Sequence, residues 1–232
     1  MRTFRVPNDP KMINRLPIGM EQFPLFRVAN YIPRVAPGKW RSDGYFIPVW
    51  DQEALCVSFS RPVQPMAVMV GVDRFNAVSG EEFSYTLSGT PQNYLVVPTQ
   101  GCLDRFKRPI EERSRLCQFI APRRGGASQA SVLHLAVFEP KVHLTPMPRL
   151  PENKVNRKRV YHDPYLADGQ PILQTWEDNP KETIEVYLVN TRTFTAITGE
   201  EPPLTPITYQ TYERNKFPWP GMSPSGVHLA SP

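Results

Sequence analysis

Short apolar runs, separated by turn residues, occupy the middle of the chain. Apolar and polar positions alternate over residues 132–138, Val-Leu-His-Leu-Ala-Val-Phe, and similarly over residues 55–59. A repeat of two residues is typical of β-strands, because successive side chains of a strand point to opposite faces. We therefore predict strands at residues 45–50, 54–60, 67–72, 94–97, 116–121 and 132–138.

The number and spacing of these runs predict the fold class. Several short strands joined by turns favour an all-β protein with an antiparallel sandwich or jelly-roll-like core over a fold of alternating strands and helices. A further strand is predicted at residues 184–189. One short helix is predicted after it, with Thr205 as the N-cap, Pro206 at the first helical position and Arg214 near the end.

Proline changes the picture at both ends of the chain. The sequence has 27 prolines in 232 residues, more than twice the usual share of about 5%. Proline fixes φ and lacks an N–H group, so proline clusters exclude long helices and central strands. We divide the chain into an extended arm (1–40), a β-sandwich core (41–140), a proline-rich and basic linker (141–182), and a short strand-helix extension with a tail (183–232).

Aromatic residues lie within the two proline-rich ends. A stiff segment loses little conformational entropy on docking, and aromatic side chains offer large contact areas. We expect these side chains to contact another copy of the chain or another protein. The alternative is that they pack over the protein's own sheet edges, which need protection. The candidate interface residues are Phe23, Phe26, Tyr31, Tyr212, Phe217 and Trp219.

One segment of the chain occurs twice. Residues 75–82, Phe-Asn-Ala-Val-Ser-Gly-Glu-Glu, return as residues 194–201, Phe-Thr-Ala-Ile-Thr-Gly-Glu-Glu, each after an apolar strand. Glycine adopts backbone conformations that are costly for other residues, so both copies predict a strand that ends in a turn. A pair of acidic ligand sites is less favoured, because adjacent carboxylates point to opposite faces of a strand. The repeated turn comprises Phe75, Gly80, Glu81, Phe194, Gly199 and Glu200.

Charge and cysteine content restrict the location and partners of the protein. The formal net charge of +5 permits an acidic partner without requiring one. Acidic residues lie close to the basic stretches at 105–108, 123–124 and 154–159, which favours a solvated surface over nucleic-acid binding. Three cysteines without metal or disulfide spacing predict reduced thiols. With no signal peptide and no segment long enough for a membrane helix, we predict a cytoplasmic protein without a membrane span.

The sequence contains no recognisable catalytic or cofactor motif. Nucleotide-binding loops, zinc-protease motifs and nucleophile elbows are all missing. His162 beside Asp163 would need further ligands to bind a metal ion. Cys102, close to Arg105 and Asp104, is more readily explained by a structural role than as a nucleophile. We therefore predict no cofactor and no metal, and we do not expect an enzyme.

A set of motifs resembles a family of uncharacterised, mostly bacterial proteins. The motifs are the first repeated segment, Pro-Gln-Asn-Tyr-Leu-Val-Val-Pro-Thr-Gln at 91–100, Leu103-Asp104, Gln-Phe-Ile-Ala at 118–121, Val189-Asn190, Thr-Gly-Glu at 198–200, Pro206, Tyr212 and Phe-Pro-Trp at 217–219. The chain departs from the family at Gly101-Cys102, where Pro-Trp is usual, and at Cys117, where arginine is usual. The resemblance covers roughly residues 25–220; it implies a shared fold and assigns no site.

Two functions remain open at this point. We expect a structural or interaction protein that self-assembles through its proline-rich arms. The alternative is a β module that binds a polar ligand, for example a carbohydrate, in loops such as residues 99–106. Such a site would need a concave surface with aromatic side chains and a few convergent polar groups.

Overall fold

The computed structural model describes residues 1–6, 20–35, 38–60, 62–110, 113–123, 130–144, 166–167, 170–171 and 173–220. It confirms an all-β fold with only two short α-helices in the described residues. The strands are β1 (Arg2–Phe4), β2 (Phe26–Arg27), β3 (Tyr45–Pro48), β4 (Glu53–Leu55), β5 (Val57–Ser58), β6 (Met66–Val72), β7 (Phe75–Asn76), β8 (Leu95–Val97), β9 (Cys102–Leu103), β10 (Arg105–Ile110), β11 (Arg113–Gln118), β12 (Ser131–Phe138), β13 (Leu166–Ala167), β14 (Gln170–Pro171) and β15 (Glu182–Val189). The helices are α1 (Thr191–Thr198) and α2 (Tyr209–Arg214).

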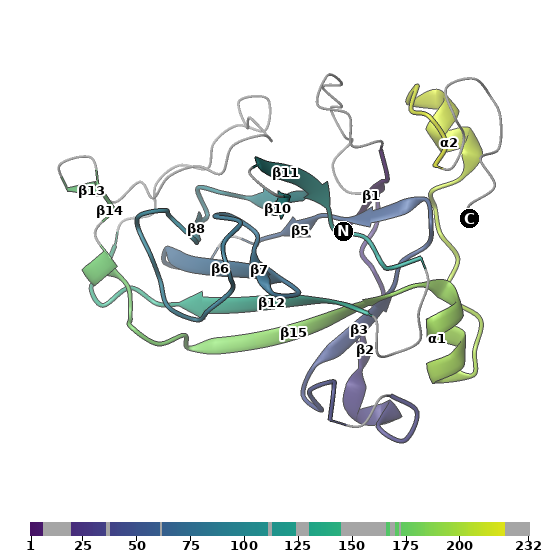
Figure 1. The fold of residues 1–232 in the computed structure, drawn as a ribbon, viewed down its shortest axis with the longest axis horizontal. Coiled ribbons are helices and arrows are strands. Elements are labelled where there is room, and N and C mark those ends of the chain that lie inside the picture. Colours follow the sequence, from purple (N-terminus) through teal and green to yellow (C-terminus); the bar gives the residue numbers. More distant parts are fainter. Residues whose placement is uncertain are drawn as a thin grey trace.

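A seven-stranded sheet forms the centre of the molecule (Figure 1). Its strands run in the order β2-β3-β15-β12-β6-β7, and β8 also pairs with β6. β12 is antiparallel to both of its neighbours, β6 and β15. In the register of these strands, His134 lies opposite Gly71 of β6 on one side and Glu185 of β15 on the other. One pair departs from the antiparallel arrangement, because β15 runs parallel to β3. A parallel pair needs a long connection, which the chain between these two strands provides.

The main core lies on one face of this sheet. Val70, Leu133 and Leu188, from β6, β12 and β15, are at most 2% exposed. They belong to one apolar cluster with Phe106 of β10 and with Phe119, which follows β11. The β10–β11 hairpin therefore forms a second layer over the sheet, and the arrangement is sandwich-like (Figure 1).

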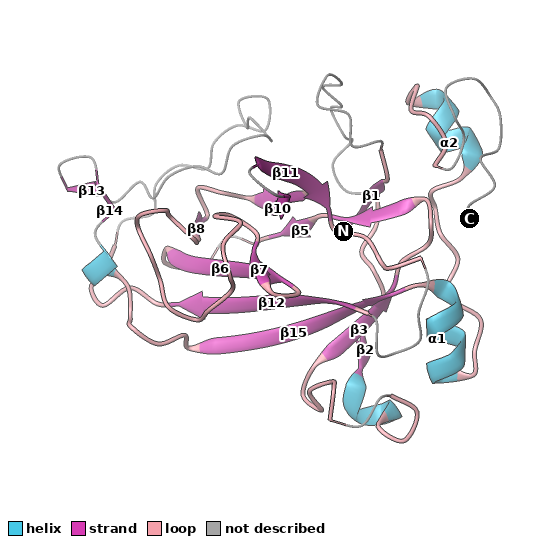
Figure 2. Ribbon diagram, in the orientation of Figure 1, coloured by secondary structure: helices cyan, strands magenta, loops and turns pink. Residues whose placement is uncertain are grey.

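The opposite face of the sheet carries two separate apolar clusters. One contains Phe46 and Tyr187 and is completed by Phe194 of α1, which lies at the end of β15 (Figure 2). The other contains Tyr94 and Trp176, whose rings meet edge to face with centroids 6.5 Å apart. Both of these side chains are 0% exposed.

Parts of the predicted arm, linker and extension belong to this packed unit. β1 pairs with β4, and β2 pairs with β3. Trp176, in the predicted linker, is fully buried, and β15 is an interior strand of the central sheet. The boundaries predicted at residues 40 and 182 therefore fall inside the packed unit, because burial brings together residues that are distant in sequence. Residues 7–19 and 36–37 of the arm and 145–165 of the linker lie outside the described residues.

The C-terminal helix begins later than predicted. Thr208 is the N-cap of α2 and forms a capping box with Thr211, so the prediction of Thr205 as the N-cap is wrong. The Thr205 hydroxyl instead contacts the Glu53 carboxylate and accepts a hydrogen bond from the Ile207 N–H at 3.0 Å. No helix in the described part of the chain has the length and apolar character that crossing a membrane requires.

The two copies of the repeated segment share one turn. Gly80 and Gly199 have φ angles of 83° and 78°, in the left-handed region that favours glycine. Each glycine N–H donates to the carbonyl oxygen four residues earlier, at 2.9 Å in the first copy and 2.8 Å in the second. In both copies the preceding hydroxyl, of Ser79 or Thr198, accepts from the N–H of the following glutamate.

The structures that lead into this turn differ between the copies. Phe75 lies in the short strand β7, whereas Phe194 lies in α1. The strands predicted before the two copies, at residues 67–72 and 184–189, are confirmed as β6 and β15. The helix α1 that carries the second copy was not predicted. Asn190 is the N-cap of α1, and Gly199 is its C-cap. Asparagine and glycine are the residue types expected at these two ends of a helix. Glu81 and Glu200 are exposed.

Candidate anion-binding pocket

A pocket lies where the β10–β11 hairpin meets the end of the central sheet and the segment after α2. Its volume is about 390 Å³, within the range of about 300–1,000 Å³ that is typical of small-ligand sites. Its lining includes three arginines, one aspartate, and the aromatic side chains of Phe106, Phe119 and Trp219. Elements from both ends and the middle of the chain thus contribute to one concave surface.

Three arginine side chains reach the pocket from separate segments. Arg5 follows β1, Arg108 lies in β10, and Arg123 follows β11. In the ladder between β10 and β11, Arg108 lies directly opposite Arg115. Arg108 therefore reaches the pocket from the hairpin, apart from the segments that carry Arg5 and Arg123.

The surroundings of Arg5 show the concentration of positive charge. Burial lowers the pKa of the Arg5 guanidinium, Arg123 lowers it further, and Asp51 raises it. The Nη1 group of Arg5 donates to the backbone carbonyl of Asp51 at 3.1 Å. Among the described residues, no ion pair joins Arg5, Arg108 or Arg123 to a carboxylate. A bound anion would therefore relieve the repulsion that Arg123 exerts on Arg5.

One carboxylate, that of Asp73, also lines the pocket. Its Oδ1 accepts from the Val132 N–H at 2.9 Å, and the Asp73 N–H donates to the Val132 carbonyl at 2.8 Å. These contacts join the turn after β6 to the start of β12. The lining still carries a positive charge overall, since three guanidinium groups outweigh one carboxylate.

The remaining walls are mainly apolar. The rings of Phe106 and Phe119 lie with centroids 5.2 Å apart, and Leu188 and Val72 of the central sheet also contribute. The side chain of Gln118 is occupied, because it accepts from the Val6 N–H and donates to the Phe4 carbonyl, both at 2.9 Å. A ligand that fills the pocket would combine an acidic group with an apolar or aromatic body.

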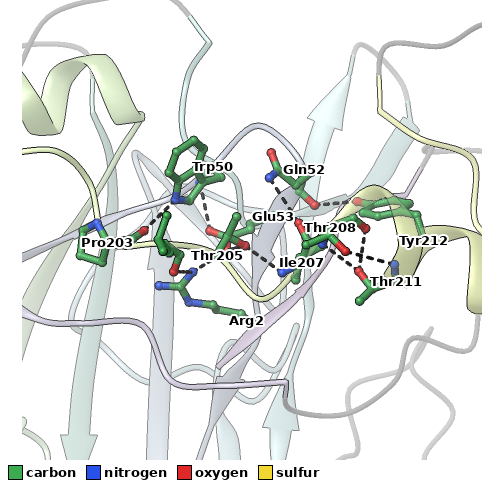
Figure 3. Close-up of polar contacts among 11 residues, drawn as sticks. Arg2, Trp50, Gln52, Glu53, Pro203, Thr205, Ile207, Thr208, Thr211 and Tyr212 are labelled. Atoms are coloured by element: carbon green, nitrogen blue, oxygen red, sulfur yellow. Dashed lines mark hydrogen bonds and ion pairs between the residues drawn. The ribbon is translucent and has the colours of Figure 1, made fainter.

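Buried polar contacts hold β1, and with it Arg5, against the core (Figure 3). Arg2 and Glu53 form an ion pair at 2.7 Å, with side chains 3% and 0% exposed. The Glu53 carboxylate also accepts from the Trp50 N–H at 3.0 Å and contacts the Thr205 hydroxyl. The ion pair thus links the start of the chain to the segment that leads into α2.

A second group of contacts involves Tyr212 of α2, which lies beside Gln52 in Figure 3. Its hydroxyl donates to the Gln52 carbonyl at 2.6 Å and accepts from the Arg5 N–H at 2.9 Å. Its ring meets Phe4 and Trp219 edge to face, with centroids 4.8 and 4.9 Å apart. Arg5 and Trp219 therefore reach the pocket from one connected unit formed by β1 and α2.

The aromatic residues expected at an interface pack against the protein's own core. Tyr212 is only 1% exposed, and the others are partly buried against apolar clusters of the same chain. These contacts are the intramolecular alternative considered above. Self-assembly stays a prediction, and it gains no support from these side chains. The six residues are Phe23, Phe26, Tyr31, Tyr212, Phe217 and Trp219.

The other candidate groups do not converge on this pocket. His134 stacks on Phe83, and its Nδ1 lies 3.4 Å from Oε1 of Glu185, its partner across the ladder. Among the described residues, no group of three or more histidine, cysteine, aspartate or glutamate side chains is placed to hold a metal ion. His162 and the basic stretch 154–159 lie outside the described residues.

Sequence reasoning did not identify this pocket. It assigned Arg108 and Arg123 to a solvated surface and did not consider Arg5. The signal that could have indicated the pocket is the closeness in sequence of residues 105–108 and 115–118, which form a hairpin. This hairpin places Phe106 opposite Cys117, and both residues line the pocket. No local pattern indicates that Arg5 joins them.

Comparisons of the chain with protein-family models, with curated proteins and with solved structures find no match. The geometry and charge of the pocket are the observations that bear on function.

Proposed function

We propose that the protein is a binding module for a small anionic ligand with an apolar body, such as an aromatic carboxylate, sulfonate or phosphate ester. The proposal depends on one observation, the convergence of Arg5, Arg108 and Arg123 on a pocket with apolar walls. Guanidinium groups bind carboxylate and phosphate oxygens through paired, charge-assisted hydrogen bonds.

This proposal changes the ligand suggested by the sequence. A neutral carbohydrate would offer no negative charge to the three arginines, whereas an acidic ligand would offset the repulsion that Arg123 exerts on Arg5. The apolar walls around Phe106 and Trp219 would exclude water from one side of the ligand. Inorganic phosphate alone would leave those walls unused, so we expect it to bind more weakly than an aromatic anion.

A fluorescent aromatic sulfonate, 8-anilinonaphthalene-1-sulfonate, tests the proposal, with uncharged N-phenyl-1-naphthylamine as its matched analogue. We expect saturable binding at one site by the sulfonate and weaker binding by the neutral analogue. A hydrogen bond to a charged group is worth about 1.5–3 kcal/mol, and about 1.4 kcal/mol corresponds to a tenfold change in affinity. Arg108→Gln and Arg123→Gln should each weaken the sulfonate at least about tenfold.

Arg192→Gln is the control, because Arg192 is exposed on α1 and its replacement lowers the net charge equally. An equal loss of affinity in this variant would show a general charge effect and contradict the proposal. A second measurement uses Cys117, which lines the pocket. The bound sulfonate should slow alkylation of Cys117 by N-ethylmaleimide, and an unchanged rate would also count against the pocket.

A further inference from the structure

Cys56 and Cys102 lie side by side on neighbouring stretches of chain. β5 and β9 pair in antiparallel register, with Ser58 opposite Cys102. Cys56 precedes Ser58 by two residues, so its side chain projects from the same face. The right-handed twist of strands brings such diagonal neighbours together. The two thiols are in hydrogen-bonding contact.

The two thiols differ in their access to solvent. Cys56 is 6% exposed, whereas Cys102 is half-buried, and neither of them forms a disulfide bond. The hydrogen bond with Cys102 and burial both raise the pKa of the Cys56 thiol. Cys56 therefore keeps its proton, and an oxidant in solution meets Cys102 first.

We propose that Cys56 and Cys102 are a modification site, at which a hydroperoxide converts the two thiols into a reversible disulfide bond. This inference goes beyond the proposed function and does not depend on it. A disulfide requires a sulfur–sulfur distance of about 2.05 Å. Because the two thiols lie on the same face of neighbouring strands and within hydrogen-bonding reach, rotations of the two side chains can bring the sulfur atoms to that distance.

The reaction proceeds in two steps that balance. The Cys102 thiolate attacks hydrogen peroxide, so that a sulfur–oxygen bond forms, the oxygen–oxygen bond breaks, and one water leaves after protonation. The Cys56 sulfur then attacks the resulting sulfenic acid; the sulfur–sulfur bond forms, and the hydroxyl group leaves as a second water with the Cys56 proton. The two thiols lose two electrons in total, and one peroxide accepts them.

The bond would fix the entry into the β10–β11 hairpin. β9 is separated from β10 only by Asp104, so a covalent link at Cys102 restrains the strand that follows it. A thiol reductant reverses the link, since exchange with an external thiolate returns both cysteines.

Peptide mapping of the full chain tests the inference. The reduced protein is treated with hydrogen peroxide in small molar excess, alkylated with iodoacetamide and digested without reductant. We expect a peptide that joins Cys56 to Cys102, alkylated Cys117, and loss of the joined peptide after dithiothreitol. Cys117→Ser is the matched control and should form the same link at the same rate.

Cys56→Ser separates the two steps. Cys102 then lacks the thiol of its strand neighbour, so its sulfenic acid should persist and react with dimedone. A link from Cys117 to either cysteine, a disulfide between two chains, or dimedone-labelled Cys102 in the unaltered protein would each overturn the proposal. The first experiment needs no substitution, so a variant that fails to fold does not leave the question open.

Discussion

The hydroxyl group of Tyr212 contacts both backbone groups of Arg5, accepting from the N–H and donating to the carbonyl oxygen, each at 2.9 Å. The two residues are 207 positions apart in sequence. The carbonyl of Gln52, at 2.6 Å, shares the same hydroxyl proton. A single side chain of α2 thus holds the N-terminal strand beside the pocket, where Arg5 is needed.

Replacing Tyr212 with phenylalanine should lower the free energy of unfolding by about 1–3 kcal/mol, because backbone groups of Arg5 lose their partner in a partly buried place. Urea denaturation measures the change. Tyr209→Phe removes the same atom from the same helix at a side chain that is 52% exposed. An equal effect of the two substitutions would contradict the role assigned to the Tyr212 hydroxyl.

Stability should fall at alkaline pH. Burial raises the pKa of both Tyr187 and Tyr212 above the ordinary value of 10.0. The unfolded chain loses these protons near its ordinary pKa while the folded chain retains them, so the stabilisation is complete below about pH 10 and declines above it. Denaturation curves at increasing pH measure this decline. The decline in stability with pH should be shallower in Tyr212→Phe. An unchanged slope would show that the Tyr212 hydroxyl does not cause it.

Removing the charge of Glu53 should destabilise the protein strongly. Glu53→Gln leaves the Arg2 guanidinium buried without its ion-pair partner, which typically costs about 3–5 kcal/mol. Replacing both residues together, by Arg2→Met and Glu53→Leu, should cost less, since no unpaired charge remains. Thermal and urea unfolding measure both variants. Asp43→Asn is the control, because it breaks the exposed Arg41–Asp43 pair and should leave the stability near that of the unaltered protein. A loss of stability in Asp43→Asn as large as that in Glu53→Gln would contradict the importance of burial.

The two copies of the repeated turn should respond differently to the same substitution. Alanine at Gly80 or Gly199 must adopt a left-handed conformation, which costs roughly 1–2 kcal/mol. A Cβ at Gly80 would also lie 3.1 Å from the Cβ of Lys107, next to the backbone, whereas one at Gly199 would meet only the guanidinium end of the long Arg34 side chain, at 3.3 Å. Gly80→Ala should therefore be the more destabilising variant in denaturant titrations. A larger loss of stability in Gly199→Ala would show that the contacts of the added Cβ do not decide how much the substitution destabilises the protein.

Local patterns predicted the long strands well and the short elements poorly. The apolar run at residues 67–72 and the alternation at residues 132–138 place β6 and β12 within one residue of their observed starts. β10 was read as a basic stretch, because charged residues on its exposed positions obscure the alternation. The match to the segment that begins at Phe75 predicts a turn where the chain forms α1, and the signals that indicate this helix are its caps, Asn190 and Gly199.

The sequence by itself determined that the chain is rich in strands and that two glycines end similar turns, because alternation and φ preference are properties of neighbouring residues. Only the tertiary structure decided that β15 lies inside the central sheet, that the aromatic residues of the chain ends pack on their own core, and that Arg5, Arg108 and Arg123 meet in one pocket. Burial and electrostatic repulsion depend on distances in space, which a linear pattern does not contain.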